Sequence, residues 1–244
     1  MNTTSKTLLA LDTDTAEKAL ALAELLKDEV AGLKVGLELV NSAGFALFEQ
    51  LRAVAGADVK IFYDCKFLDI PNTVAGASRA AARRGVWMFN VHASGGTAMM
   101  RAAVTGAKEG TQETGVARPL VIAVSVLTSM SAEVLRDELG VMRPLPEHVV
   151  NLARLAQDSG CDGLVASPLE VAAIRQACGQ DFLLVIPGVR PAGAAVGDQK
   201  RMMTPGEAIR AGADYLVIGR PITAADDPVS AAKSINAEIS GNNA

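Results

Sequence analysis

The segment over residues 61–73 carries the residues whose types and spacing best suit chemistry. It begins as an apolar strand and then sets three charged side chains, Asp64, Lys66 and Asp69, at the end of that strand. Residues two apart in a strand face the same side, so we expect Asp64 and Lys66 to point together. Opposite charges at the end of a buried strand cost free energy unless they are paired. This cost favours catalysis or binding over packing as the role of the segment.

Polar side chains also stand at the ends of other predicted strands. Those outside the first segment are Asp12, Lys34, Asn90, His92, Ser125, Thr128, Arg190 and Arg220. In a barrel of parallel strands these ends share one rim, where the active sites of barrel enzymes lie. Successive residues of a strand point to opposite faces, so we expect Asp64 and Lys66 to point to that rim and Cys65 to pack under helices. Clustered charges such as Asp12 and Lys34 serve packing poorly, so we predict a catalytic site at the rim.

A second group of residues, at the ends of the last two predicted strands, suits a phosphate. Arg190 follows the turn formed by Pro187 and Gly188, and Gly219 and Arg220 lead into a helix. Barrel enzymes often bind phosphate at this place with backbone N–H groups and basic side chains. The planar guanidinium of arginine can engage two phosphate oxygens at once. The sequence therefore predicts a phosphomonoester ligand, with two exposed arginines at loop ends as the alternative.

Eight short apolar runs alternate with helical patterns along the chain. The predicted strands cover residues 7–12, 32–36, 59–66, 86–92, 120–127, 163–167, 182–187 and 215–219. The predicted helices cover residues 15–27, 43–54, 72–84, 97–108, 146–159, 168–178, 205–211 and 228–239. Strict alternation implies parallel strands joined by right-handed crossovers. The strands are continuously apolar, which indicates a sheet covered on both faces.

Eight strand–helix units in 244 residues favour an α/β fold, the (β/α)8 TIM barrel. We predict one domain over residues 1–244, because the sequence shows no interdomain linker and α/β barrels commonly run to about 250 residues. A doubly wound open sheet is the alternative. It is less favoured because no Gly-x-Gly-x-x-Gly motif follows the first predicted strand.

The composition argues against several classes of function. Lysine and arginine total 23 and aspartate and glutamate total 27, which gives a net charge of −4. Without a basic cluster, this balance argues against nucleic-acid binding. The three cysteines, Cys65, Cys161 and Cys178, are too scattered for a disulfide framework or a zinc site. No segment approaches the roughly 18 apolar residues of a membrane span, and no signal peptide is evident, so we expect a cytoplasmic protein.

A series of motifs gives the sequence a family resemblance. In chain order they are Leu-Ala-Leu-Asp, Leu-Lys-Val-Gly, Asp-x-Lys-Phe-x-Asp-Ile-Pro-Asn-Thr, Asn-Val-His-Ala-Ser-Gly-Gly, Val-Leu-Thr-Ser-Met, Pro-Gly-Val-Arg-Pro, Gly-Asp-Gln-Lys-Arg and Val-Ile-Gly-Arg-Pro-Ile-Thr. In this series, over residues 9–223, the chain resembles the bacterial orotidine 5'-phosphate decarboxylases. The resemblance implies a homodimeric barrel that converts orotidine 5'-monophosphate to UMP and carbon dioxide. It implies that this last step of de novo pyrimidine nucleotide synthesis needs no metal and no cofactor.

The resemblance also implies a catalytic role for a set of charged residues. Lys66 would protonate C6 of the pyrimidine as carbon dioxide leaves. The network of alternating charge around it would consist of Lys34, Asp64, Lys66 and Asp69. Asp69 would reach into the site of the partner subunit across the dimer. Ile70 and Thr73 would complete the partner's site as well.

The remaining implied roles concern substrate binding. Asp12 and Lys34 would hold ribose hydroxyls, and Thr128 would contact the region of the base. The phosphate would be held by Arg190, Gln199, Gly219 and Arg220. The segment over residues 191–199 is rich in glycine and alanine, a composition that suits a closing lid.

Two positions of the central motif depart from its commoner form. Cys65 and Leu68 stand where leucine and histidine are expected. By parity Cys65 faces away from the charged residues, so we expect a change of packing only. Leu68 replaces a polar residue beside Asp69, which predicts an altered contact at the dimer interface.

Two other functions stay open from the sequence. The first is a metal-dependent sugar-phosphate decarboxylase or aldolase-type synthase of the same barrel group, whose members carry a carboxylate near the end of the second strand. Lys34 takes that place here and would repel a metal ion. The second is a non-catalytic phosphate-binding barrel, which has no use for the costly charges of Asp64, Lys66 and Asp69.

Overall fold

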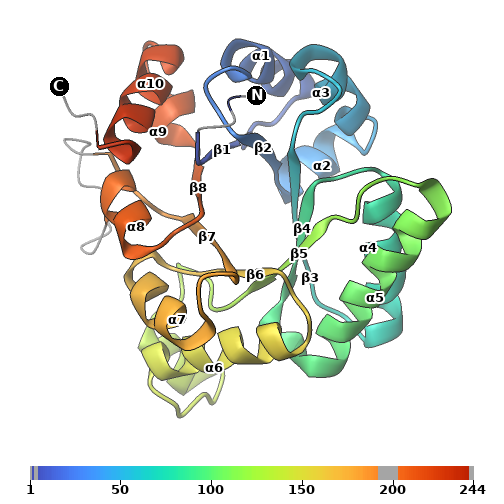
Figure 1. Cartoon of the computed structure of the whole chain (residues 1–244), viewed down its shortest axis with the longest axis vertical. Coiled ribbons are helices and arrows are strands. Elements are labelled where there is room, and N and C mark those ends of the chain that lie inside the picture. Colours follow the sequence, from blue (N-terminus) through green and yellow to red (C-terminus); the bar gives the residue numbers. More distant parts are fainter. Residues whose placement is uncertain (1, 3–4, 192–202, 242–244) are drawn as a thin grey trace.

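The strands of this protein form a closed parallel barrel with helices outside it (Figure 1). The computed structural model describes residue 2, residues 5–191 and residues 203–241. Across these residues the strands pair in the order β1 to β8, and β8 pairs with β1 to close the ring. The predicted (β/α)8 TIM barrel is therefore confirmed. The alternative of a doubly wound open sheet is wrong, because such a sheet has two unpaired edges.

The elements alternate along the chain as the sequence predicts. The strands are β1 (Thr7–Ala10), β2 (Gly32–Val35), β3 (Ile61–Phe67), β4 (Met88–His92), β5 (Leu120–Val124), β6 (Gly163–Val165), β7 (Leu183–Pro187) and β8 (Tyr215–Ile218). The α-helices are α1 (Ala16–Leu26), α2 (Leu37–Ala43), α3 (Leu47–Ala55), α4 (Pro71–Arg83), α5 (Gly96–Thr114), α6 (Leu145–Asp158), α7 (Val171–Cys178), α8 (Pro205–Ala211), α9 (Arg220–Thr223) and α10 (Pro228–Ile239). Short helical turns are η1 (Ala93–Gly95), η2 (Val134–Glu138) and η3 (Pro168–Glu170).

The predicted helix over residues 43–54 differs most from the structure. Two helices, α2 and α3, occupy this region, and α2 begins at Leu37, directly after β2. Gly44 ends α2 with a φ of +72° and donates its N–H to the carbonyl of Val40. A positive φ favours glycine, which stops one helix so that a second can start in a new direction.

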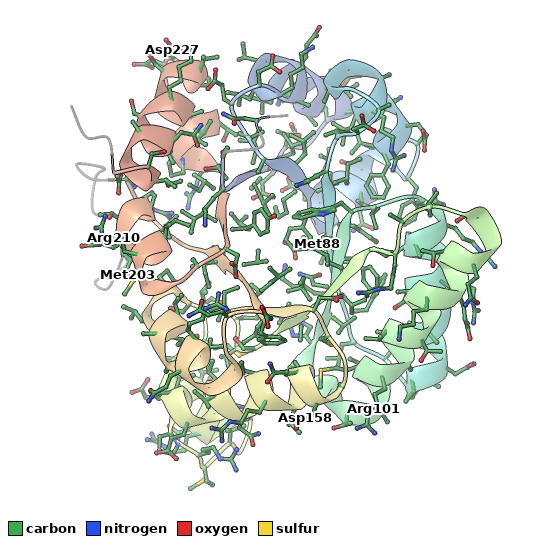
Figure 2. The ribbon with its side chains drawn as sticks, viewed as in Figure 1. Met88, Arg101, Asp158, Met203, Arg210 and Asp227 are labelled. Carbon is green, nitrogen blue, oxygen red and sulfur yellow. The ribbon has the colours of Figure 1, made fainter. Side chains whose placement is uncertain are left out.

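The core has two layers that follow the parity of the strands. A small cluster fills the barrel interior, and its buried members are Leu8, Ala31, Phe62, Met88, Ile122 and Val185. Met88 is labelled in Figure 2, inside the ring of strands. A larger cluster lies between strands and helices and includes Ile61, Tyr63 and Cys65 of β3. Alternation along β3 therefore directs Phe62 inward and its neighbours Ile61 and Tyr63 toward the helices.

Two arginine–aspartate pairs lie at the end of the barrel where the strands begin. Asp214 precedes β8, and its Oδ2 accepts hydrogen bonds from the Nη2 of Arg175 (2.7 Å) and from a backbone N–H of β7 (2.8 Å). Asp162 precedes β6 and accepts hydrogen bonds from Arg118 (2.6 Å) and from a backbone N–H of β5 (2.8 Å). The side chain of Arg175 is 8% exposed, whereas that of Arg118 is 32% exposed.

The difference in burial predicts a difference in stability between two matched variants. Asp214→Ala is expected to lower the free energy of unfolding by about 3 kcal/mol, because it removes the carboxylate partner of the buried guanidinium of Arg175. Asp162→Ala is expected to lower it by about 1 kcal/mol, because Arg118 reaches water. Urea denaturation of both variants measures the two losses. Equal losses would contradict the view that burial of the arginine sets the cost.

Candidate functional site

A cavity of about 320 Å³ opens at the rim where the strands end. Its floor is apolar and is formed by Phe62, Val124, Val165 and Val217, while charged and polar residues stand above them. The charged and polar lining residues are Asp12, Lys34, Asp64, Lys66, Thr128, Arg190 and Arg220. The cavity thus joins residues from strand ends far apart in the sequence. An apolar floor under converging charges is the usual form of a small-molecule site.

The charges on one side of the cavity alternate in sign. The Nζ of Lys34 lies 2.7 Å from the Oδ1 of Asp12 and 3.5 Å from the Oδ2 of Asp64. The Nζ of Lys66 lies 2.6 Å from the Oδ1 of Asp64. Asp64 is therefore held between two ammonium groups. Such pairing offsets the cost of placing these charges in a largely buried site.

Asp64 is ionised at neutral pH in this arrangement. Burial by itself raises the pKa of its carboxyl, but Lys34, Lys66 and the side-chain amide of Asn90 act in the opposite direction. The net result is a pKa below the ordinary value of an aspartate. The carboxylate thus stays negative beside the Nζ of Lys66.

The backbone of β3 is irregular where it carries Lys66. Between Tyr63 and Phe67 the register with β4 shifts, so that three residues of β3 stand opposite Asn90 alone. Lys66 has a φ of +49°, and it is the one non-glycine residue with a positive φ in the part of the chain that the structure describes. A β-bulge therefore interrupts the regular alternation of side chains between Asp64 and Lys66, although both side chains line the cavity.

Asn90 is the residue of this site whose importance the sequence did not reveal. Its side chain is fully buried and bonds both to Asp64 and to the N–H of Lys66. The sequence placed Asn90 at a predicted strand end but indicated no role for it. The available signal was a polar residue within the apolar run of β4, because a buried amide must find hydrogen-bond partners.

The predicted phosphate residues line the same cavity from the ends of β7 and β8. Arg190 follows β7, and Gly219 and Arg220 follow β8 at the start of α9. A Cβ at Gly219 would stand 3.3 Å from the Cβ of Ala10, so the backbone passes close to β1 there. Gln199 lies outside the described residues, as does the predicted lid over residues 191–199 apart from Pro191.

The residues after β3 are exposed and do not line the cavity of their own chain. Asp69, Ile70 and Thr73 are all exposed, and none of them lines the cavity. Ile70 is 66% exposed and Leu68 is 57% exposed. The Oδ1 of Asp69 accepts a hydrogen bond from the N–H of Ile70 at 2.6 Å.

Two further strand-end residues lie outside the charged cavity. His92 and Ser125 line a separate apolar cavity of about 450 Å³, next to Leu68. Burial, and then the charge of Lys66, lowers the pKa of His92, so its imidazole is neutral at pH 7. Cys65 faces the helices as predicted, and its thiol donates a hydrogen bond to the carbonyl of Asn90 at 3.2 Å.

Comparison with known proteins finds relatives along nearly the whole chain. Residues 5–235 match the family described as orotidine 5'-phosphate decarboxylase / HUMPS. The orotidine 5'-phosphate decarboxylase of Moorella thermoacetica is 50% identical over 239 residues, which cover 98% of this chain and 94% of the relative. That of Paramagnetospirillum magneticum is 52% identical over 231 residues, which cover 95% of this chain and 97% of the relative. The crystal structure of orotidine 5'-phosphate decarboxylase from Lactobacillus acidophilus is similar, with a TM-score of 0.84, 39% identity and coverage of 96% of this chain and 99% of the other.

Proposed function

The chain belongs to the orotidine 5'-phosphate decarboxylase / HUMPS family, and we propose that it converts orotidine 5'-monophosphate to UMP and carbon dioxide. The observation that carries this proposal is the ordered array of Lys34, Asp64 and Lys66 above an apolar floor. A planar pyrimidine suits the apolar floor. Its phosphate suits the basic side chains of Arg190 and Arg220 on the other side of the cavity.

Lys66 is the proposed general acid of the reaction. Breaking the bond from C6 to the carboxylate releases carbon dioxide and leaves an electron pair on C6, a carbon that is not conjugated with a carbonyl. The ammonium of Lys66 stabilises this charge and then transfers a proton to C6. The lysine regains its proton from water, to which its side chain is 30% exposed. The product is UMP, and the sequence of steps needs no cofactor.

The neighbours of Lys66 hold its side chain in place. Asp64 bonds its ammonium at 2.6 Å, and Lys34 in turn bonds Asp64 and Asp12. A fixed array of this kind reorganises little during the reaction, which is how electrostatic stabilisation lowers a barrier. Asp12 and Lys34 are proposed to bind the ribose hydroxyls, and Thr128 the base.

The proposed binding energy comes mainly from the phosphate. Arg190, Gly219 and Arg220 are placed to hold it, together with Gln199 from the segment outside the described residues. Contacts made far from C6 orient the pyrimidine over Lys66 and exclude water from the site. The arginines therefore serve orientation, and Lys66 serves the chemical step.

We further propose that the active form is a homodimer. The exposed apolar side chains of Leu68 and Ile70 flank Asp69 beside the rim, and large exposed apolar groups favour burial against a partner. In the proposed dimer, Asp69, Ile70 and Thr73 complete the cavity of the partner subunit. Asp69 then extends the alternating charges of Asp64 and Lys66 by one further carboxylate.

The proposed biosynthetic role places the enzyme in the cytoplasm. Over the described residues, no helix combines the length and the hydropathy needed to cross a lipid bilayer. Nucleotide synthesis draws on small, phosphorylated molecules, which membranes retain. The proposed partners are therefore the substrate and a second copy of the chain, with neither nucleic acid nor membrane.

The reaction is expected to proceed at full rate in EDTA. The ammonium of Lys34 stands between the carboxylates of Asp12 and Asp64, where a divalent cation would otherwise bridge them. Purified protein should therefore consume orotidine 5'-monophosphate equally well with magnesium and with excess EDTA, as followed by the absorbance of the pyrimidine. A strict requirement for magnesium would instead favour a sugar-phosphate decarboxylase or synthase. Absence of turnover under both conditions would favour a non-catalytic phosphate-binding barrel.

A further inference from the structure

Asn90 connects the two charged residues at the centre of the proposed site. Its Oδ1 accepts a hydrogen bond from the backbone N–H of Lys66 at 2.7 Å. Its Nδ2 donates a hydrogen bond to the Oδ1 of Asp64 at 2.7 Å. That same carboxylate oxygen binds the ammonium of Lys66 at 2.6 Å. One buried amide therefore fixes both the backbone of the lysine and the carboxylate that holds its side chain.

The backbone of Lys66 needs such a support. A left-handed backbone costs a residue with a Cβ about 1–2 kcal/mol, and such a conformation persists only where its surroundings enforce it. The bulge in β3 removes the regular pairing with β4, so the N–H of Lys66 bonds to the side chain of Asn90 instead. The backbone carbonyl of Asn90 also accepts a hydrogen bond from Cys65. Asn90 thus contacts the bulge through both its side chain and its main chain.

We propose that Asn90 is a positioning residue that holds Lys66 and Asp64 in their reactive arrangement. This inference rests on the proposed decarboxylase function and adds to it a residue that does not line the cavity. Asparagine suits the task because one planar amide supplies an acceptor for Lys66 and a donor for Asp64 at the same time. Leucine has neither group, and an ionised aspartate has no donor.

The first test compares Asn90→Ala with wild type. Alanine removes both hydrogen bonds, so Lys66 is free to leave its left-handed conformation and Asp64 loses one partner. We expect kcat to fall by about 100-fold, because small displacements of a reacting group have effects of that size. KM should change little, because the phosphate contacts on the far side of the cavity remain. A kcat within about threefold of wild type would overturn the proposal.

The second test is the pH dependence of Asn90→Asp. A protonated aspartic acid copies the amide, because it accepts from the N–H of Lys66 and donates to Asp64. Above the pKa of the carboxyl pair, two carboxylates face each other and repel. The ratio of variant to wild-type kcat should therefore be highest at low pH and fall as pH rises. A ratio that is the same at every pH would overturn the proposal, and this test remains decisive if the alanine variant does not fold.

The other titratable groups around position 90 do not produce the same pH dependence of the kcat ratio. The titratable and charged groups that face it are Asp64, Cys65 and Lys66 on β3, Lys34 on β2 through Asp64, and His92 on β4 itself. Its register partner on β5, Ile122, carries no charge. Burial raises the pKa of the Cys65 thiol to about 12, so it stays protonated over the range of the assay. His92 titrates in wild type as well, and the ratio removes its shared contribution.

A matched control is available at the other end of the barrel. Asn236 in α10 also makes two hydrogen bonds, accepting from the hydroxyl of Ser5 at 2.9 Å and donating to the carbonyl of Glu29 at 2.7 Å. Asn236→Ala should lower the melting temperature without changing kcat or its pH profile. A loss of kcat equal to that of Asn90→Ala would show that any lost asparagine has this effect, and would overturn a positioning role.

A structural measurement separates this inference from the proposed function. A crystal structure of Asn90→Ala should show Lys66 with a negative φ and its Nζ displaced from Asp64. An unchanged Lys66 would overturn the inference even if the wild type is an active decarboxylase. If the wild type does not consume orotidine 5'-monophosphate, the proposed function fails, while the φ of Lys66 still reports whether Asn90 positions it.

Discussion

Replacing Lys66 with alanine is expected to abolish decarboxylation, with kcat/KM falling by about 10⁴-fold or more. The ammonium has two proposed tasks, to stabilise the charge at C6 and to supply the proton. Alanine performs neither. The barrel should stay folded, because Asp64 keeps its bonds to Lys34 and to Asn90 and is not left as an unpaired buried charge.

The measurement combines activity with two controls. The circular dichroism spectrum and the melting temperature of Lys66→Ala should stay close to those of wild type, and UMP should still bind through its phosphate. Lys60→Ala is the matched lysine variant, because Lys60 lies just before β3 and stacks over Trp87 with 5.1 Å between its Nζ and the ring centre. Its kcat should equal that of wild type. Wild-type activity in Lys66→Ala would contradict the proposed mechanism.

Mixing two inactive variants is expected to restore activity. In the proposed dimer each site uses its own Lys66 and the Asp69 of the other subunit. A hybrid of Lys66→Ala and Asp69→Ala subunits therefore contains one site with both mutations and one site with neither. After random exchange, half of the dimers are hybrids, so about a quarter of the wild-type activity should return. Each variant alone is expected to remain near zero.

The controls for this experiment concern subunit exchange. Tagging one variant and isolating hybrids by affinity confirms that exchange has occurred, and a mixture of two Asp69→Ala preparations should stay inactive. Confirmed hybrids without activity would contradict the shared site. Asp69 would then act within its own subunit or have no catalytic role.

The parts of the site that the sequence predicted depend on regular repeats. A closed parallel barrel brings all strand ends to one rim, so Asp12, Lys34 and Arg220 could be expected to meet although they are far apart in the chain. The alternation of side chains along β3 likewise directs Cys65 toward the helices and Asp64 toward the cavity. These inferences need only the strand period and the topology, and both are robust features of an alternating α/β sequence.

The parts that the sequence missed depend on local departures from those repeats. Strand parity assumes a regular pleat, whereas Lys66 adopts a conformation that lysine rarely takes, inside a register shift. Within that shift the N–H of Lys66 bonds to the side chain of Asn90 in place of a backbone partner. The helix α2 was also missed: the predicted helix began at residue 43, whereas α2 covers Leu37–Ala43 and ends at Gly44. The hydrogen bond from the backbone of Lys66 to the side chain of Asn90 leaves no periodic signal in the sequence.

The left-handed backbone at Lys66 makes lysine unfavourable for stability at the position where the proposed activity requires it. Glycine adopts a φ of +49° without the penalty that a Cβ imposes, so glycine at this position would relieve strain in the fold and remove the proposed acid. Selection of a mutant library for thermal stability alone would therefore favour glycine at position 66 and yield inactive proteins, which is the trade-off expected at a strained active site. Engineering a more robust version of this barrel should start from the end where the strands begin. There, substitutions that keep the Arg175 and Asp214 pair intact do not touch the charges at the rim.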